Sequence, residues 1–420
     1  MPVTFNSPYP MTLVPGSIPK TIFSTIAAIE LQYNESAKSV ILLFHSNDIY
    51  SCVILMYSIY AIYLILLLVW VFVWRSVKSG GFDPEKISLT VVVPFRNEAG
   101  NLSKLIASLE NQTHTDFEVI FVNDHSDDRG ELKLAEFLGS VSFSYKLLNL
   151  TKSEGKKAAI SLAISQAAND LVITTDADCE MGPEWLRSMS SPFENNELKM
   201  LVGPIGLMGN SFWQKMQSIE SSAMIGVGGA MLHFNKPLMA NGANLAYRKS
   251  VFNELKGFEG ISSTPSGDDE LLMNKISNQY PSGIRFLKSP EAMVFTDGLN
   301  NWREFRQQRL RWSSKWKIGK RMSTQMMAVF IFLVQLVQLV LLGVLLVDIN
   351  HWQTALILLI TRLLVEMIFL QSVRRSLGQK MHWMPFSVNY LLYPFYAIYF
   401  GVAANFGAFE WKGRSYKVNN

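Results

Sequence analysis

Apolar residues gather in long uncharged runs at both ends of the 420-residue chain, and the segment between them is of mixed polarity. Residues 50–74 carry no charge before Arg75, and residues 324–347 form a second uncharged run. Each run is long enough to cross a bilayer, which takes about 20 apolar residues in a helix. The pattern therefore predicts transmembrane helices toward both ends of the chain and a soluble domain at residues 87–312.

Two further apolar runs follow the second span. Residues 353–373 contain Arg362 and Glu366, which are four apart and are therefore predicted to pair on a helix face turned away from lipid. Residues 385–404 are aromatic-rich and contain Pro394, which makes them a weaker candidate. Residues 324–404 are thus expected to hold two or three transmembrane helices. The remaining parts are an N-terminal segment, an interfacial segment and a tail, at residues 1–49, 313–323 and 405–420.

Basic residues border the middle segment on both sides. One group follows the first span closely, and a larger one precedes the second span; they are Arg75, Lys78 and Lys86, and Arg311, Lys315, Lys317, Lys320 and Arg321. Because cytoplasmic borders are enriched in Lys and Arg, we expect an integral membrane protein whose middle domain lies in the cytoplasm. With four spans the basic tail would lie outside, so either the last apolar segment does not cross or the positive-inside rule fails there, and the number of spans stays open.

Composition agrees with a protein that lies partly in lipid. Hydrophobic residues make up 49% of the chain and charged residues 17%, below the roughly 25% of a soluble domain. A net charge of +4 is too small to indicate a nucleic-acid partner. Cys52 and Cys179 form neither a metal-spaced cluster nor a disulfide framework, which is typical of a reducing, cytosol-facing domain.

Short β-branched runs alternate with helical segments in the middle of the chain. Residues 88–95 and 117–124 are typical of buried parallel strands, and residues 99–112 between them have helical spacing. A second helical stretch at residues 156–170 precedes another apolar run at residues 171–175. This alternation predicts an α/β fold with a doubly wound, mostly parallel sheet, whose ligands bind beyond the C-terminal ends of the strands.

Polar residues fall at three of these predicted strand ends: Asn97-Glu98, Asn123-Asp124 and Asp176-Ala177-Asp178. Side chains two apart on an extended segment point the same way, so Asp176 and Asp178 are expected to aim at one point. Like charges that close repel, which predicts a shared cation, and hard Mg²⁺ or Mn²⁺ suits carboxylate oxygens. An ordinary strand-end turn is the alternative, because Asp is common there. Neither a Rossmann glycine loop nor a P-loop occurs in the chain.

Seven ordered motifs between Val91 and Trp312 resemble those of family 2 glycosyltransferases with a GT-A fold. They are "VVVPFRNE", "FVNDHSDD", "GKKAA", "TTDADCE", "GANLAYRKSVFNELKGF", "GDDELL" and "QQRLRW". The chain looks most similar to the membrane-embedded branch that contains cellulose, chitin and hyaluronan synthases and ceramide glucosyltransferase. The resemblance implies a nucleotide-sugar donor, UDP-linked, and a divalent metal. In one departure, Asn123 stands where many members have an acid, which leaves Asp124 to meet the base or ribose.

By this resemblance Asp269 is the general base that takes the proton of the acceptor hydroxyl, with Asp268 as the alternative. Asp176 and Asp178 hold the metal ion, and Trp312 lines the acceptor site. The residues expected to contact the donor are Glu98, Asp124, Lys156, Asp176, Gln308 and Arg311.

Ordinary structure also explains several of these residues. Acidic side chains at residues 268–270 suit the positive end of a helix dipole. Arg311 and Trp312 suit a basic helix at the membrane interface. Lys156 and its neighbour Lys157 suit a solvated lysine pair, although Gly155 before them allows close backbone approach.

The sequence therefore predicts a membrane-bound inverting glycosyltransferase. A lipid acceptor is favoured because few spans frame the catalytic block. One alternative is a polysaccharide synthase subunit that extends a β-linked glycan, and another is a non-catalytic membrane protein that binds nucleotide-sugars.

Overall fold

The structure is a computed structural model that describes residues 51–77, 87–261, 267–318, 322–403, 408–411 and 414–417. The chain divides into two compact units, residues 1–58 and residues 59–420. The N-terminal segment predicted at residues 1–49 lies outside the described residues. All of the sheet and the candidate site belong to the second unit.

A seven-stranded sheet forms the centre of the second unit, in the order β3-β2-β1-β4-β8-β6-β9. The first four strands along the chain are mutually parallel; they are β1 (Leu89–Phe95), β2 (Phe117–Asn123), β3 (Ser144–Asn149) and β4 (Leu171–Thr174). The other three are β6 (Met200–Val202), β8 (Leu245–Arg248) and β9 (Ile284–Phe286). Strand β8 runs antiparallel to both of its neighbours. The mostly parallel sheet predicted from the sequence is confirmed.

Helices cover both faces of this sheet because successive side chains of a strand point to opposite sides. Val91 and Val93 face a core shared with α2 (Leu102–Glu110), α3 (Gly130–Leu138) and α5 (Trp185–Ser190). Val92 faces a second core shared with α4 (Lys156–Gln166), α7 (Lys249–Glu254) and α8 (Asp268–Gln279). Burial on both sides explains the apolar stretches at residues 91–95 of β1 and 119–122 of β2, because every residue of both strands is buried. The fold is therefore doubly wound, as predicted.

A smaller sheet of three strands is joined to the large one through Asn244. Its strands are β5 (Cys179–Met181), β7 (Ile205–Met208) and β10 (Val294–Asp297). A 3₁₀ turn at Ser191–Glu194 lies between α5 and β6. The fully buried Asn244 amide donates to the carbonyls of Pro204 and Ala292, each at 2.8 Å, and accepts the Trp185 indole N–H at 3.0 Å. One side chain thus satisfies three buried polar groups at the junction of the sheets.

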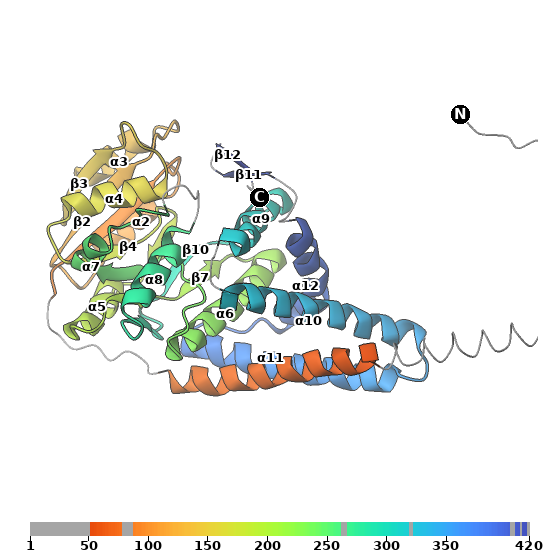
Figure 1. The fold of residues 1–420 in the computed structure, drawn as a ribbon. Helices are drawn as coiled ribbons and strands as arrows, with labels where there is room; N and C mark the ends of the chain where they lie inside the picture. The colour runs from red at the N-terminus through yellow and green to blue at the C-terminus, as the bar shows by residue number, and fades with distance from the viewer. Residues whose placement is uncertain are drawn as a thin grey trace, which may run out of the picture. The chain divides into compact units, whose positions relative to one another are not determined.

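Helix α6 (Phe212–His233) joins the soluble domain to the membrane helices. It begins with a capping box, in which Ser211 and Gln214 satisfy each other's backbone N–H groups. It contacts β7 and β9 as well as α11 (Trp352–Ser376) and α12 (Trp383–Ala403) (Figure 1). The Arg374 guanidinium of α11 donates to the hydroxyls of Ser218 and Ser222 on α6 at 3.2 and 2.8 Å.

Three helices of the described residues are long and apolar enough to cross a membrane. They are Ser51–Ser76, Thr324–Val347 within α10 (Met322–Val347), and Trp352–Ser376. The transmembrane helices expected at both ends are therefore present. Helix α12, which contains Pro394, is not one of the three, and its crossing stays a prediction. Beyond it, the described part of the predicted tail forms a hairpin of β11 (Ala408–Trp411) and β12 (Arg414–Lys417).

Arg362 and Glu366 pair within the helix bundle, as their spacing predicts. Their side chains meet at 2.8 Å, and Glu366 also accepts the Tyr63 hydroxyl at 2.7 Å. Gln335 on α10 accepts from Arg362 at 3.3 Å. The buried pair therefore links three helices by polar contacts where lipid offers no competing partners.

Replacing Asn244 by Ala is expected to reduce stability by about 3 kcal/mol, because two buried carbonyls and one indole N–H lose their partner. The midpoint of thermal unfolding in detergent should fall by roughly 5–10 °C. Replacing the exposed Asn253 by Ala is the control. Equal midpoints for the two variants would show that Asn244 does not join the sheets.

Candidate active site

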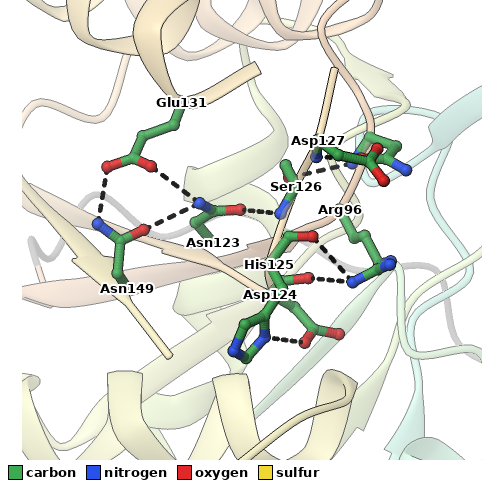
Figure 2. Close-up of polar contacts among 9 residues, drawn as sticks. Arg96, Asn123, Asp124, His125, Ser126, Asp127, Glu131 and Asn149 are labelled. Atoms are coloured by element: carbon green, nitrogen blue, oxygen red, sulfur yellow. Dashed lines mark hydrogen bonds and ion pairs between the residues drawn. The ribbon is translucent and has the colours of Figure 1, made fainter. Parts of the chain in front are cut away.

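Hydrogen bonds tie together the loops that follow β1 and β2. The Asn97 side chain accepts the backbone N–H of Asp127 at 2.9 Å. The Arg96 guanidinium donates to the carbonyl oxygens of Asp124 and His125, each at 2.9 Å (Figure 2). The two strand ends thus form one connected edge, as expected for neighbouring parallel strands.

Asn123, the residue that departs from the family pattern, forms hydrogen bonds with other residues of the protein. Its amide donates to Glu131 at 3.0 Å and to Asn149 at 2.9 Å, and its oxygen accepts the Ser126 N–H at 3.0 Å. Asn149 in turn donates to Glu131 at 2.7 Å. Figure 2 shows this network on one side of the strand end and the Asp124 carboxylate away from it, beside His125. Asn123 therefore closes a structural network, and Asp124 is the acid of this pair of positions.

Asp124 and Glu98 are both buried at this edge, and both have neighbours on their own loops. Asp124 Oδ1 lies 3.2 Å from Nδ1 of His125, whose backbone has a positive φ of 56°. Glu98 Oε2 accepts the side-chain N–H of Asn101 at 2.6 Å, next to the start of α2. Their predicted contacts with a donor stay predictions.

Asp176 and Asp178 lie in the turn that connects β4 to β5. Strand β4 ends at Thr174, and Ala177 and Asp178 form the turn. The extended geometry assumed from the sequence is therefore wrong, since pairing ends before the first acid. Asp178 Oδ2 accepts the Thr296 hydroxyl of β10 at 3.1 Å. The turn alternative is thus correct for the backbone, and it leaves both carboxylates at the sheet's C-terminal edge.

Lys156 is the first residue of α4 and lies among the acids. Its Nζ is 2.6 Å from Asp176 Oδ1 and 3.2 Å from Asp268 Oδ2, and 18% of its side chain is exposed. Burial alone would lower the pKa of Lys156, but the charges of Asp176 and Asp268 raise it well above its ordinary value. Lys156 is therefore a charged internal residue and not half of a solvated pair.

The two glycines near Lys156 serve different needs. Gly155 has a φ of 94°, so the sharp turn into α4 requires glycine there. Close approach of another group does not require it, because a side chain at Gly155 would meet open space. A Cβ on Gly242 would lie 2.7 Å from Asp268 Oδ2 and 2.9 Å from Lys156 Nζ. The segment around Gly242 therefore passes against the ion pair, and a side chain at that position would displace the charged ends of Asp268 and Lys156.

Helix α8 begins with the acids predicted to hold the base. Asp268, Asp269 and Glu270 form its first turn, so the helix-start explanation applies to them as well. The buried Asp269 accepts the backbone N–H of Gly242 at 3.2 Å through Oδ2 and that of Glu270 at 2.7 Å through Oδ1. These contacts fix Asp269 beside the ion pair of Lys156 and Asp268.

Helix α9 (Trp302–Ile318) adds a second cation, and it runs unbroken through the domain boundary predicted at residue 312. Burial lowers the pKa of Arg311, and four carboxylates oppose this change: Asp176, Asp269, Asp268 and Asp178. The guanidinium therefore lies within electrostatic range of these four acids. Gln308 accepts from Arg309 at 3.2 Å, and the Arg309 guanidinium lies 4.5 Å from the Trp312 ring. Arg311 thus lies in one cluster with Lys156 and the acids. Gln308 and Trp312 contact Arg309 instead.

The charges of this cluster fit a divalent cation. Four carboxylates surround two cations, which leaves a formal excess of two negative charges. Within the described part of the chain, no group of three or more His, Cys, Asp or Glu side chains is placed to hold a metal. Asp176 and Asp178 are oxygen ligands of the kind Mg²⁺ and Mn²⁺ prefer, with phosphate and water as the other ligands. Burial raises the pKa of Cys179 well above its ordinary value, so this neighbouring thiol stays neutral.

Sequence reasoning missed three contributors to this site. Thr296 contacts Asp178 from a strand of four residues, too short to be recognised by periodicity. Gly242 was seen only as part of a longer motif, and its need for space follows from Lys156 and Asp268. The Arg309 contacts depend on the packing of α9, which no local pattern encodes.

Residues 90–256 match the family model described as glycosyl transferase family 2. A dodecaprenyl-phosphate galacturonate synthase from Rhizobium johnstonii is 29% identical over 185 residues, which cover 42% of this chain and 53% of that protein. A dolichol-phosphate mannosyltransferase from Pyrococcus furiosus is 25% identical over 198 residues, covering 46% and 54%. The chain thus spans about half the length of these curated relatives.

Solved structures agree on the fold. The mannosyltransferase PcManGT from Pyrobaculum calidifontis, solved in complex with GDP-Man and Mn²⁺, superposes with a TM-score of 0.51 and 14% sequence identity. The match covers 77% of this chain and 95% of that one. At this identity the likeness establishes the GT-A fold alone.

Replacing Lys156 by Met is expected to destabilise the protein by about 2 kcal/mol, less than for a fully buried pair because Asp176 is 35% exposed. The loss should be constant from pH 6 to 9. The pKa of Lys156 is raised in the folded protein. Its contribution to stability is therefore complete below the pKa that it has in the unfolded chain, and it is lost only above the pKa that it has in the folded one. Mn²⁺ should raise the thermal midpoint more in the variant than in the parent, because it replaces the missing positive charge.

The control is Lys157→Met, since the Lys157 ammonium donates to the carbonyl of Ile261. The same response to Mn²⁺ in parent, test variant and control would contradict the assignment of Lys156 to the acid cluster.

Proposed function

We propose that the chain is a membrane-bound inverting glycosyltransferase that moves a sugar from a nucleotide diphosphate donor to a lipid acceptor, because residues 90–256 match the family 2 glycosyltransferase model. One observation carries the proposal. Lys156 and Arg311 lie among four carboxylates at the C-terminal edge of a parallel sheet, where such folds bind ligands. A divalent ion would balance the excess negative charge of that cluster, and the ion, Lys156 and Arg311 would together attract a diphosphate.

The donor would lie across the edge of the sheet, with Asp124 and Glu98 near its nucleoside and the acid cluster near its phosphates. Asp176 and Asp178 are the residues that would hold Mg²⁺ or Mn²⁺, and the bound ion supplies charge stabilisation to the departing diphosphate. Lys156, Arg311 and Gln308 would orient the phosphate oxygens from the protein side. We propose a UDP-linked donor, with a GDP-linked one as the comparison.

The acceptor is proposed to be a lipid because membrane helices adjoin the domain and the curated relatives act on polyprenyl-phosphate lipids by name. Trp312, on the helix that precedes α10, would line the acceptor site. Asp269 lies on a different element from the metal carboxylates, as an inverting displacement requires, and would take the proton from an acceptor hydroxyl. A lipid phosphate is already ionised near pH 7 and needs no such base.

The orientation proposed from the basic borders puts the catalytic domain in the cytoplasm, where nucleotide-sugars are available to it. The domain bounds given from the sequence remain part of the proposal, except that α9 links residues 302–318 in one helix.

Membranes that contain the protein should transfer label from a UDP-sugar to an organic-soluble product when polyprenyl phosphate is added. EDTA should abolish transfer, and Mn²⁺ or Mg²⁺ should restore it. Asp176→Asn should reduce transfer by at least about 100-fold, since it removes charge stabilisation of the leaving group. Asp348→Asn, on the loop between α10 and α11, is the control. High-mass product would indicate the polysaccharide alternative, and donor binding without transfer would indicate the non-catalytic one.

Asp269→Asn separates the two kinds of lipid acceptor. With a hydroxyl acceptor, loss of the base should lower kcat by roughly 10²–10⁴. With a phosphate acceptor, kcat should fall far less, because the attacking oxygen carries its charge before binding. Parental rates on a hydroxyl acceptor, in folded variant protein, would rule out Asp269 as the base.

A further inference from the structure

Arg309 on α9 forms a buried ion pair with Glu220 on α6. The side chains meet at 2.7 Å, with 6% of Arg309 and 12% of Glu220 exposed. A charge pair removed from water is costly unless its geometry is good, so its position at this helix contact requires an explanation.

Two aromatic rings fix the orientation of the Arg309 guanidinium. Its central carbon lies 4.5 Å from the Phe305 ring centroid and 4.5 Å from that of Trp312. Its Nε is buried, and no residue in the described part of the chain accepts from it. The flat guanidinium is therefore held by stacking and by Glu220 together, and a lysine offers no equivalent surface.

The ion pair sets the rotation of α9 about its own axis. Successive helical residues are about 100° apart, so Arg309 and Arg311 point to nearly opposite sides. With Arg309 held against α6, Arg311 is directed to the side where the acids act on it. Trp312 is three residues from Arg309 and shares its side, where the stacking contact holds it.

Glu220 also connects α9 to α12. The Tyr396 hydroxyl of α12 lies 3.4 Å from Glu220 Oε2 and 2.8 Å from the Asn389 oxygen. Tyr396 further packs edge-on against Phe305 of α9, with ring centroids 6.0 Å apart. Glu220 is thus the point where α6, α9 and α12 meet.

We propose that the Glu220–Arg309 pair is a positioning device that couples the helix bundle to the active site by holding Arg311 toward the leaving diphosphate. Glu220 and Arg309 are positioning residues and act through Arg311. The inference rests on the proposed function for its effect on turnover, but the coupling between helices stands on the contacts alone.

Glu220→Gln should lower kcat about tenfold and leave the donor KM within about twofold, because an interaction made in the transition state is weakened. In an Arg311→Ala background the same change should have little further effect, since the residue through which it acts is gone. Arg309→Lys is the second variant, measured if Glu220→Gln does not fold. It keeps the positive charge but removes the flat stacking surface, and it should give a similar loss of kcat.

Glu366→Gln is the matched control, because it disrupts another buried Arg–Glu pair that contacts α10 and the first helix. It should lower the thermal midpoint and leave kcat per folded molecule unchanged. An equal loss of kcat in this control would overturn the proposal, and so would full additivity of Glu220→Gln with Arg311→Ala.

Hydrogen–deuterium exchange of residues 302–318 provides a readout that needs no activity. Glu220→Gln should raise exchange in this segment, whereas Glu366→Gln should not. If the parent transfers no sugar, the proposed function fails while exchange still tests the coupling. Unchanged exchange in Glu220→Gln would overturn the coupling itself.

Discussion

The crowding of negative charge at the end of β4 is the constraint on which the rest of the structure depends. Four carboxylates from two elements approach each other there, and they repel unless positive charge lies among them. Lys156, at the start of α4, and Arg311, within α9, supply part of that positive charge. A divalent ion would balance the remaining two negative charges. The segment of Gly242 passes directly against the charged groups, so a side chain there would displace Asp268 or Lys156.

This site depends on the membrane helices as well as on the sheet. Arg311 belongs to α9, which leads toward α10, and the rotation of α9 is fixed by contacts with α6 and α12. Helix α6 is in turn held to α11 through Arg374. Lys288 of the soluble domain donates to the carbonyl of Trp74, near the end of the first helix. The catalytic edge and the bundle therefore form a connected set of contacts within the second unit.

The sequence predicted the helices and strands whose apolar residues form a clear local pattern. Strand β1 was predicted to within one residue because both of its faces are buried and its run is unbroken. Strand β3 was missed because Ser144–Asn149 is half exposed and has no β-branched run, and α3 because Leu134 and Leu138 are a weak helical signal. Strands of the small sheet have three or four residues, too few for a period to be read. The motifs located the acids, but the turn at Asp178 and the contacts of Arg309 arise from tertiary packing.

The central claim is that Asp176 and Asp178 hold a divalent ion together with a nucleoside diphosphate. Mn²⁺ binding to the purified protein, followed by electron paramagnetic resonance with and without UDP or GDP, tests it most directly. The account predicts one Mn²⁺ per chain, bound more tightly when the nucleotide is present, and loss of this ion in both Asp176→Asn and Asp178→Asn. Unchanged Mn²⁺ binding in the two variants would contradict it.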